Sequence, residues 1–95
     1  MSDFSLKSYV TDHKTIHLVG IGGVSMSALA ELLLHLGAKV TGSDRTETDV
    51  TDKLAKLGAS ITYAHLPENV DSADLVIRTA AVHDDNPEIA HAREL

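Results

Sequence analysis

Residues 17–27 read HLVGIGGVSMS and place three glycines, Gly20, Gly22 and Gly23, between an apolar run and the start of a predicted helix. Glycine loses more backbone entropy on folding than any other residue, so a cluster of glycines at such a junction needs a steric or a ligand-binding reason. A tight strand-to-helix turn would explain the cluster without a ligand. A cradle for phosphate groups would explain it with one.

The composition is typical of one small globular domain. The chain has 95 residues, 43% hydrophobic and 23% charged, which argues against disorder. Its net charge of -6 argues against nucleic acid or an anionic membrane surface as a partner. It has no cysteine, the first residues lack the apolar core of a signal peptide, and no apolar run approaches membrane-spanning length. We therefore expect a cytoplasmic protein.

Residues 1–14 show no regular spacing of hydrophobic residues and are expected to form an N-terminal arm. Along residues 15–95, short apolar, β-branched segments alternate with helical ones. The pattern predicts strands near 15–20, 39–43, 60–63 and 74–79, and helices near 24–36, 47–58 and from 87 onward. Such alternation is typical of a parallel sheet with right-handed crossovers. We predict an α/β, Rossmann-like three-layer sandwich with strand order 3-2-1-4. The last helix has no stop signal before Leu95, which indicates a piece of a longer chain.

The helical segments allow predictions about packing. Helix 24–36 carries one narrow polar stripe and is expected to pack on most of its circumference. Helix 47–58 is expected to point Val50, Leu54 and Leu57 into the core and to carry i,i+4 ion pairs on its solvent-exposed face. Those pairs are Asp49 with Lys53 and Asp52 with Lys56. Gly37 and Gly58 are predicted C-caps, and Asn86 is a predicted N-cap. The apolar run 75–77 predicts a strand covered on both faces.

In a doubly wound sheet a ligand lies beyond the carboxyl ends of the strands, where the strand order reverses. Here that point falls between the first and fourth strands, flanked by the loop 20–25 and the segment 79–86. Gly20 would permit the sharp turn, and Gly22, expected at positive φ, would let the backbone approach a ligand together with Gly23. The free N–H groups at the start of helix 24–36 would suit a pyrophosphate.

Two further residues bear on this interpretation. A dinucleotide fingerprint would have glycine where this chain has Ser25, which weakens the motif. Asp44 follows the second strand, where an acid that binds ribose hydroxyls is expected, although a turn carboxylate or N-cap is an alternative.

We expect no metal site on the six histidines, and the chain has no cysteine to act as a thiolate ligand. His17 is expected to be a packed strand residue. His65, in the loop after the third strand, is either a ligand contact or a surface histidine. No Ser–His–Asp or paired-carboxylate constellation emerges, so no catalytic residue is assigned.

Four segments together resemble the N-terminal domain of the Mur ligase family, in order and at matching intervals: HLVGIGGVSMSALAELL (17–33), GSD (42–44), VTDKLAKLGA (50–59) and TAAVHDDNPEIAHAREL (79–95). The resemblance is strongest to members that join L-alanine to UDP-N-acetylmuramate in peptidoglycan synthesis. It implies that this domain holds the UDP part of UDP-N-acetylmuramate. A central domain of the family binds ATP and magnesium, and a C-terminal domain helps to bind the amino acid. ATP phosphorylates the substrate carboxylate, and the alanine amine then displaces phosphate to form the amide.

The resemblance also implies which residues contact the substrate. The diphosphate would lie against the loop and helix start formed by Gly20, Gly22, Gly23, Val24, Ser25, Met26 and Ser27. Asp44 would lie by the ribose or uracil, with Arg45 close by. The uridine pocket would be lined by His65, Thr79, Ala80 and Ala81. The family usually has glycine at position 25 and an aromatic or aliphatic residue at position 78, where this chain has Ser25 and Arg78.

The chain has no G-x-x-x-x-G-K-[ST] segment, so we expect no cofactor on these 95 residues and no ligation by them alone. The resemblance implies that ATP and magnesium bind to the remaining domains of a full-length enzyme. Two alternatives stay open: an NAD-dependent dehydrogenase half-domain and a non-catalytic nucleotide-sensing module. The segment TAAVHDDNPE (79–88) favours the ligase.

Overall fold

The computed structural model describes residues 14–79, 82 and 85–95. The predicted arm therefore lies outside the described residues except for Lys14, as do Ala80 and Ala81. The elements are, in chain order, β1 (Thr15–Val19), α2 (Val24–His35), β2 (Lys39–Ser43), α3 (Asp49–Lys56), β3 (Ser60–Thr62), the 3-10 helix η1 (Pro67–Val70), β4 (Leu75–Ile77) and α4 (Pro87–Glu94).

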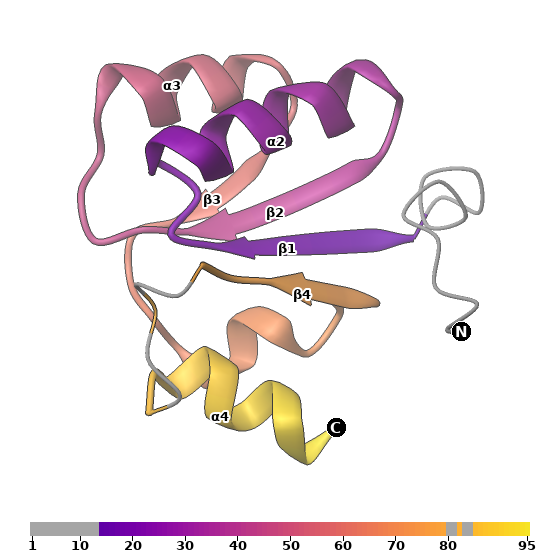
Figure 1. Cartoon of the computed structure of the whole chain (residues 1–95), viewed down its shortest axis with the longest axis vertical. Coiled ribbons are helices and arrows are strands. Elements are labelled where there is room, and N and C mark those ends of the chain that lie inside the picture. The colour runs from indigo at the N-terminus through magenta and orange to yellow at the C-terminus, as the bar shows by residue number, and fades with distance from the viewer. Residues whose placement is uncertain (1–13, 80–81, 83–84) are drawn as a thin grey trace.

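The four strands form one parallel sheet in the order β3-β2-β1-β4. Its register sets Thr15 beside Lys39 and Ile16 beside Leu75. Figure 1 shows α2 and α3 on one face of the sheet and η1 with α4 on the other. The predicted three-layer sandwich and its strand order are confirmed. Because the strands are parallel, the loops that follow them gather at one edge of the sheet.

The core lies between the sheet and α2. β1 is one of the two inner strands, and its Ile16, Leu18 and Val19 are fully buried. From α2, Met26, Ala30 and Leu33 pack against the cluster that contains Ile16 and Leu18. Burial of a leucine or isoleucine side chain stabilises the fold by about 1.5–3 kcal/mol, so this layer holds α2 and the loop before it in place.

The glycines predicted to end the first two helices lie one residue beyond the observed C-caps, Leu36 and Leu57. Gly37 and Gly58 follow α2 and α3 with φ of 89° and 118°, values that favour glycine. The Asn86 side chain accepts a hydrogen bond of 2.9 Å from the Glu88 N–H at the start of α4. The N-cap of α3 is Thr48, whose hydroxyl accepts from the Thr51 N–H while its own N–H donates to the Thr51 hydroxyl, a capping box.

The packing predictions for the helices are partly wrong. In α3, Leu54 is buried, but Val50 and Leu57 are 42% and 41% exposed because Thr51 occupies the inner face beside Leu54. The Lys53 ammonium lies 3.4 Å from Glu31 of α2, and no ion pair with Asp49 is found among the described residues. In α2 only one face is buried, and Leu32 and Leu36 are more than half exposed.

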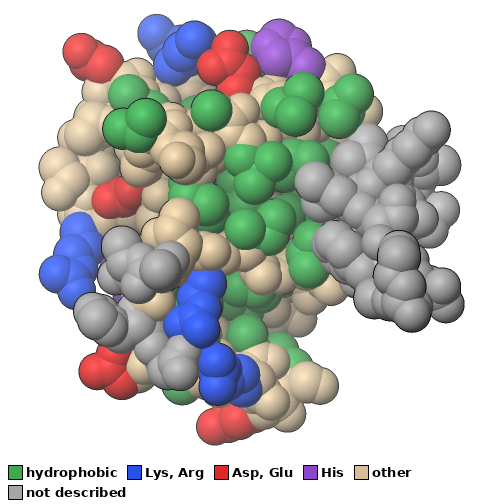
Figure 2. All heavy atoms as spheres, viewed as in Figure 1, with side chains coloured by type: hydrophobic (Ala, Val, Ile, Leu, Met, Phe, Trp, Pro, Cys, Tyr) green, Lys and Arg blue, Asp and Glu red, His purple; other side chains and the backbone are tan. Residues whose placement is uncertain are grey.

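The fourth strand lies at the edge of the sheet. Its three residues are half-buried, so the prediction of a strand covered on both faces is wrong for this structure. β4 pairs only with β1 and is shorter than the predicted 74–79. Hydrophobic side chains gather in Figure 2 at the centre of the face that shows α2 and the β4 edge.

Candidate functional site

The glycine loop makes a sharp turn between β1 and α2. Gly20 has a φ of 78°, which confirms it as the residue that permits the turn. The N–H groups of Gly20 and Ile21 both donate to the carbonyl of Ser43, at 2.8 and 2.9 Å, and the N–H of Gly23 donates back to Gly20. The loop is therefore fixed on the end of β2 by backbone bonds.

Gly22 and Asp44 are in direct contact at the ends of β1 and β2. The Gly22 N–H donates to Asp44 Oδ2 at 2.8 Å. The expected positive φ of Gly22 is wrong, since among the described glycines only Gly20, Gly37 and Gly58 have one. Glycine is needed at position 22 for space, because a Cβ there would lie 2.8 Å from Asp44 Oδ2 and 3.0 Å from Thr51 Cγ2.

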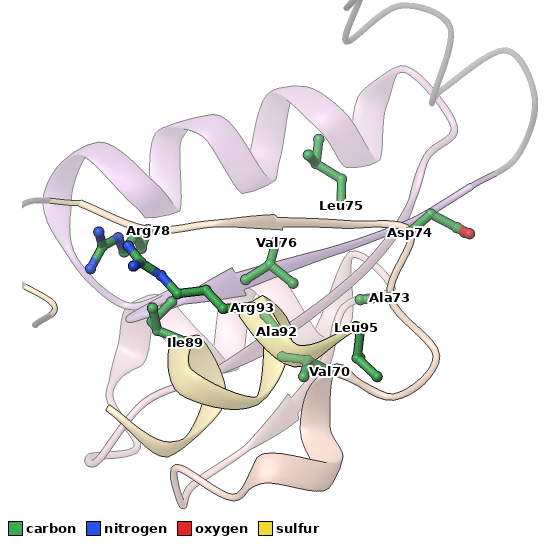
Figure 3. Close-up of a pocket in the computed structure, with 10 residues that line it drawn as sticks. All are labelled: Val70, Ala73, Asp74, Leu75, Val76, Arg78, Ile89, Ala92, Arg93 and Leu95. Carbon is green, nitrogen blue, oxygen red and sulfur yellow. The ribbon is translucent and has the colours of Figure 1, made fainter. Parts of the chain in front are cut away.

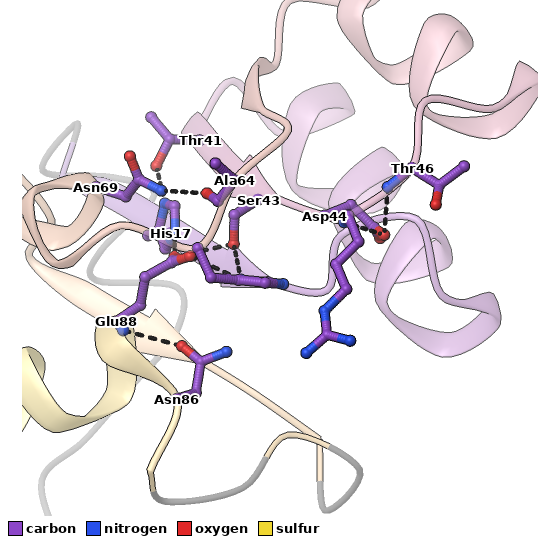
Figure 4. Close-up of polar contacts among 11 residues, drawn as sticks. His17, Thr41, Ser43, Asp44, Thr46, Ala64, Asn69, Asn86 and Glu88 are labelled. Carbon is purple, nitrogen blue, oxygen red and sulfur yellow. Dashed lines mark hydrogen bonds and ion pairs between the residues drawn. The ribbon is translucent and has the colours of Figure 1, made fainter.

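Asp44 also organises its own turn. Its Oδ1 accepts hydrogen bonds from the N–H groups of Arg45, at 2.8 Å, and Thr46, at 3.4 Å (Figure 4). Asp44 thus acts as a turn carboxylate, the alternative that the sequence left open. A carboxylate oxygen can accept two hydrogen bonds, so Oδ2 keeps acceptor capacity for a ligand hydroxyl.

The first turn of α2 points free donors at the same edge of the sheet. A helix leaves its first N–H groups without intrahelical partners, here those of Val24, Ser25 and Met26. Its N-cap is Gly23, which has no side chain to bond them, whereas Thr48 and Asn86 cap α3 and α4. Val24 and Ser25 are exposed, Met26 is buried in the core, and the Ser27 hydroxyl donates to the Val24 carbonyl at 3.1 Å.

The remaining predicted site residues follow the other strands. Arg45 is exposed after β2, and Thr79 is half-buried after β4. The Thr79 carbonyl accepts from the Val82 N–H at 3.0 Å. A Cβ on Gly20 would lie 3.8 Å from Val82 Cγ2, so the segment after β4 reaches the glycine loop. The structure thus brings Val82, of the second predicted flanking segment, next to the glycine loop.

A buried polar network joins β1, β2, the loop after β3 and α4 (Figure 4). Its centre is the fully buried carboxylate of Glu88. Oε1 accepts from His17 Nε2 at 2.5 Å and from Ser43 Oγ at 2.9 Å, and Oε2 lies 2.8 Å from His65 Nδ1. His17 Nδ1 lies 2.7 Å from Thr41 Oγ1. His17 is buried as predicted, but it is bonded to polar side chains.

These contacts keep Glu88 ionised. Burial alone would raise the pKa of the Glu88 carboxyl, but hydrogen bonds from His17, Ser43 and His65 outweigh burial and hold the pKa below its usual value. Ser43 belongs to both halves of the site, since its carbonyl holds the glycine loop and its hydroxyl bonds to Glu88. Ser43 therefore connects the hydrogen-bond network of Glu88 to the glycine loop.

The sequence reasoning assigned no role to Glu88 or Ser43. An acid in the first turn of a helix, after Asn-Pro, is ordinarily explained by the helix dipole. The signal that could have identified Glu88 is the pair of histidines on other strands, one within β1 and one in the loop after β3. His65 is not a free surface histidine, because its ring is largely buried against Glu88, and its contact with a ligand stays a prediction.

Away from the glycine loop, a hollow of about 490 Å³ lies between β4, η1 and α4. Figure 3 shows Val76 pointing toward α4 and Leu75 toward the opposite face. Across the described ranges, no group of three or more His, Cys, Asp or Glu side chains could hold a metal ion. Within those same ranges, no helix has the length and apolarity to cross a bilayer.

The strand order and the glycine loop at the strand ends define a doubly wound α/β domain of the Rossmann type. Residues 15–95 match the family described as Mur ligase family, catalytic domain. The chain belongs to the Mur ligase family.

Individual proteins support this assignment. The UDP-N-acetylmuramate–L-alanine ligase of Pelobacter propionicus is 52% identical over 80 residues, covering 84% of this chain and 17% of that protein. The crystal structure of the UDP-N-acetylmuramate-alanine ligase of Thermotoga maritima matches with a TM-score of 0.80 and 50% identity, over 86% of this chain and 19% of that one. This chain therefore spans less than a fifth of the length of either relative.

The fold is also similar to a dehydrogenase. The shikimate dehydrogenase of Aquifex aeolicus matches with a TM-score of 0.58 and 34% identity, over 90% of this chain and 33% of that one. Its lower score leaves the ligases as the better structural match.

Proposed function

We propose that this chain is the N-terminal, UDP-binding domain of a ligase that joins L-alanine to UDP-N-acetylmuramate. The observation that carries the proposal is the 52% identity to a curated ligase of that name across most of the described residues. The site geometry supports it, because the glycine loop, Asp44 and the uncapped start of α2 lie at one edge of a parallel sheet.

The diphosphate is proposed to bind at the start of α2. The N–H groups of Val24, Ser25 and Met26 and the positive end of the helix dipole stabilise an anion without lysine side chains. The exposed Ser25 hydroxyl adds a donor where the family usually has glycine. The free acceptor capacity of Asp44 Oδ2 suits a ribose hydroxyl, with Arg45 next to it.

The uridine is proposed to lie between the loops that follow β3 and β4, next to His65 and the segment that begins at Thr79. ATP and magnesium would bind in other parts of the parent enzyme, because these 95 residues contain no phosphate-binding G-x-x-x-x-G-K-[ST] segment. The chain would hold the nucleotide end of the substrate while another domain performs the transfer.

The similarity to shikimate dehydrogenase favours a dehydrogenase half-domain as the second candidate. The two candidates differ in the ligand that stabilises the chain. Thermal unfolding with UDP-N-acetylmuramate, UDP, NAD or ATP separates them, since a ligand that binds only the folded state raises the melting temperature. We expect UDP-N-acetylmuramate and UDP to raise it and NAD to leave it unchanged. A rise with NAD but not with UDP would favour the dehydrogenase, and a rise with ATP alone would favour a nucleotide-sensing module.

A further inference from the structure

The donors around Glu88 fix the position of a proton on His65. An ionised carboxylate can only accept hydrogen bonds, so each group within bonding distance of it must donate. His65 Nδ1 lies 2.8 Å from Glu88 Oε2 and must therefore carry a hydrogen. Ser43 Oγ, 3.2 Å from the same nitrogen, uses its own hydrogen on Glu88 Oε1 and offers His65 only lone pairs. Both neighbours of Nδ1 thus require the Nδ1–H form.

His17 closes the other side of the carboxylate in the same way. Its Nε2, 2.5 Å from Glu88 Oε1, must donate. In the neutral ring Nδ1 then accepts from the Thr41 hydroxyl at 2.7 Å. The Glu88 carboxylate therefore accepts three hydrogen bonds, from β1, β2 and the loop after β3. Both histidines can be neutral in this arrangement.

The opposite nitrogen of His65 is left as an acceptor. In a neutral imidazole with hydrogen on Nδ1, Nε2 carries a lone pair. Among the described residues every buried side-chain nitrogen or oxygen has a hydrogen-bond partner, and Nε2 of His65 has none, so this atom is open to solvent. The ring itself is only 16% exposed, which restricts how it can turn.

His65 follows β3 at the sheet edge where the glycine loop follows β1, and Ser43 contacts both. The geometry points to Glu88 as a positioning residue that fixes the Nδ1–H tautomer of His65, so that Nε2 accepts a hydrogen bond from a donor group of the nucleoside. This inference rests on the proposed uridine nucleotide as ligand. The diphosphate offers only acceptors at neutral pH and is excluded from this contact. The donors of uridine are the ribose hydroxyls and the imide N–H of the base.

The first experiment measures the tautomer directly. Long-range ¹H–¹⁵N spectra of the histidine-labelled chain at pH 8 are expected to show His65 protonated on Nδ1 and unprotonated on Nε2. Added UDP is expected to shift the Nε2 resonance. An Nε2–H tautomer in the free chain overturns the inference. So does an unchanged Nε2 resonance when calorimetry shows that UDP is bound, and that result leaves the proposed function intact.

The second experiment uses Glu88→Gln to exchange donor and acceptor in the hydrogen bond between residue 88 and His65 Nδ1. The amide oxygen is expected at the place of Oε1, where His17 and Ser43 both donate, so the amide nitrogen takes the place of Oε2 and donates to His65 Nδ1. His65 then changes to the Nε2–H tautomer, and affinity for UDP falls by about tenfold or more, the range for one hydrogen bond replaced by two opposed donors.

Glu94→Gln is the matched control, because it removes a negative charge from the same helix at a side chain that is 75% exposed. We expect it to leave the tautomer and the affinity unchanged. If Glu88→Gln keeps the Nδ1–H form and full affinity, the positioning role is wrong. The spectra of the wild-type chain decide the tautomer even if Glu88→Gln does not fold.

Two analogues identify the donor. Loss of affinity with 2′,3′-dideoxy-UDP assigns Nε2 to a ribose hydroxyl, and loss with N3-methyl-UDP assigns it to the imide. Full affinity for both analogues overturns the inference alone. Failure of UDP itself to bind the wild-type chain overturns the proposed function, and the inference with it.

Discussion

The backbone N–H of Gly22 donates to Asp44 Oδ2 at 2.8 Å, and this contact fixes the glycine loop beside the end of β2. The two residues come from loops that follow neighbouring strands of a parallel sheet. Their approach leaves no room for a side chain at position 22. Glycine at position 22 therefore leaves room for the Asp44 carboxylate to reach the backbone N–H.

Gly22→Ala is expected to lower the free energy of unfolding by about 1–3 kcal/mol, the usual cost of overpacking. The new Cβ would lie 2.8 Å from Asp44 Oδ2 and 3.0 Å from Thr51 Cγ2. Because the displaced loop precedes α2, affinity for UDP should fall as well. Urea unfolding and calorimetric titration measure the two effects.

Asp44→Ala supplies the control for this interpretation. With Asp44 truncated, Gly22→Ala should cost less than it does alone, since one of the two clashes is gone and contacting residues are not additive. Full additivity of the two substitutions would contradict the assigned contact. Gly23→Ala, whose Cβ would lie 3.3 Å from the Gly20 carbonyl, should cost less than Gly22→Ala.

Gly42 in β2 is a second position where there is no room for a side chain. A Cβ there would lie 2.5 Å from Ile21 Cδ1 and 2.7 Å from Ile21 Cβ, and Ile21 is fully buried. Gly42→Ala should therefore displace Ile21 and the loop around it, destabilising the chain by about 1–3 kcal/mol and weakening UDP binding. Equilibrium unfolding and titration with UDP test both parts.

Gly37→Ala separates packing from backbone strain. Position 37 has a φ of 89°, and a Cβ there would meet no atom of the described residues within 4 Å. Its expected cost of about 1–2 kcal/mol therefore arises from the left-handed backbone alone. It lies at the other end of α2 from the glycine loop, and UDP affinity should not change. Equal losses of affinity in Gly37→Ala and Gly42→Ala would contradict the proposed displacement of Ile21.

The order of the elements could be predicted because each is marked locally. Alternating apolar and helical segments, the positive φ that Gly37 and Gly58 supply, and the Asn86-Pro87 start are all readable within a few residues. The position of Thr51 could not be read in this way. Its hydroxyl donates to the Thr48 carbonyl and accepts from Tyr63 Oη at 3.0 Å, so a residue counted as polar is fully buried.

The sharp turn of the glycine loop could be predicted, but the contacts within the loop could not. The distance between Gly22 and Asp44, and that between Gly42 and Ile21, depend on how two strands pack. Glu88 lies 71 residues from His17 in the chain, and only the docking of α4 brings them together. Sequence patterns report local periodicity and therefore miss a buried ion held by distant partners.

Glu88 should make the chain sensitive to acid. Hydrogen bonds hold its pKa below the value in the unfolded chain, against the effect of burial, so the unfolded state takes up the proton first as pH falls. The stability that Glu88 contributes is present above about pH 5 and is lost as pH falls through its folded pKa. Unfolding in urea at pH 7, 5 and 4 should show this loss.

Glu88→Gln should lack this part of the loss in acid, because the amide does not titrate. Glu88→Ala should cost about 1–3 kcal/mol at pH 7 for each buried donor that it leaves unsatisfied. If the wild type and Glu88→Gln lose stability in parallel from pH 7 to 4, the low pKa of Glu88 is not the source of the acid sensitivity.

The contact between α4 and η1 should respond to pH in the opposite direction. His91 Nε2 lies 2.6 Å from Asp71 Oδ1, and Glu94 lies on the other side of the ring. The hydrogen bond to Asp71 raises the pKa of His91 against the opposing effect of burial, and the charges of Asp71 and Glu94 add to the rise. A raised pKa contributes stability that is fully present below the unfolded value, about 6.5, and is lost as pH rises through the folded value. Melting temperatures between pH 6 and 9 should therefore fall in the wild type and fall less in Asp71→Asn. Glu68→Gln removes an exposed acid from the same 3-10 helix and should keep the wild-type slope. The same slope in all three proteins would show that the proton on His91 does not stabilise the docking of α4.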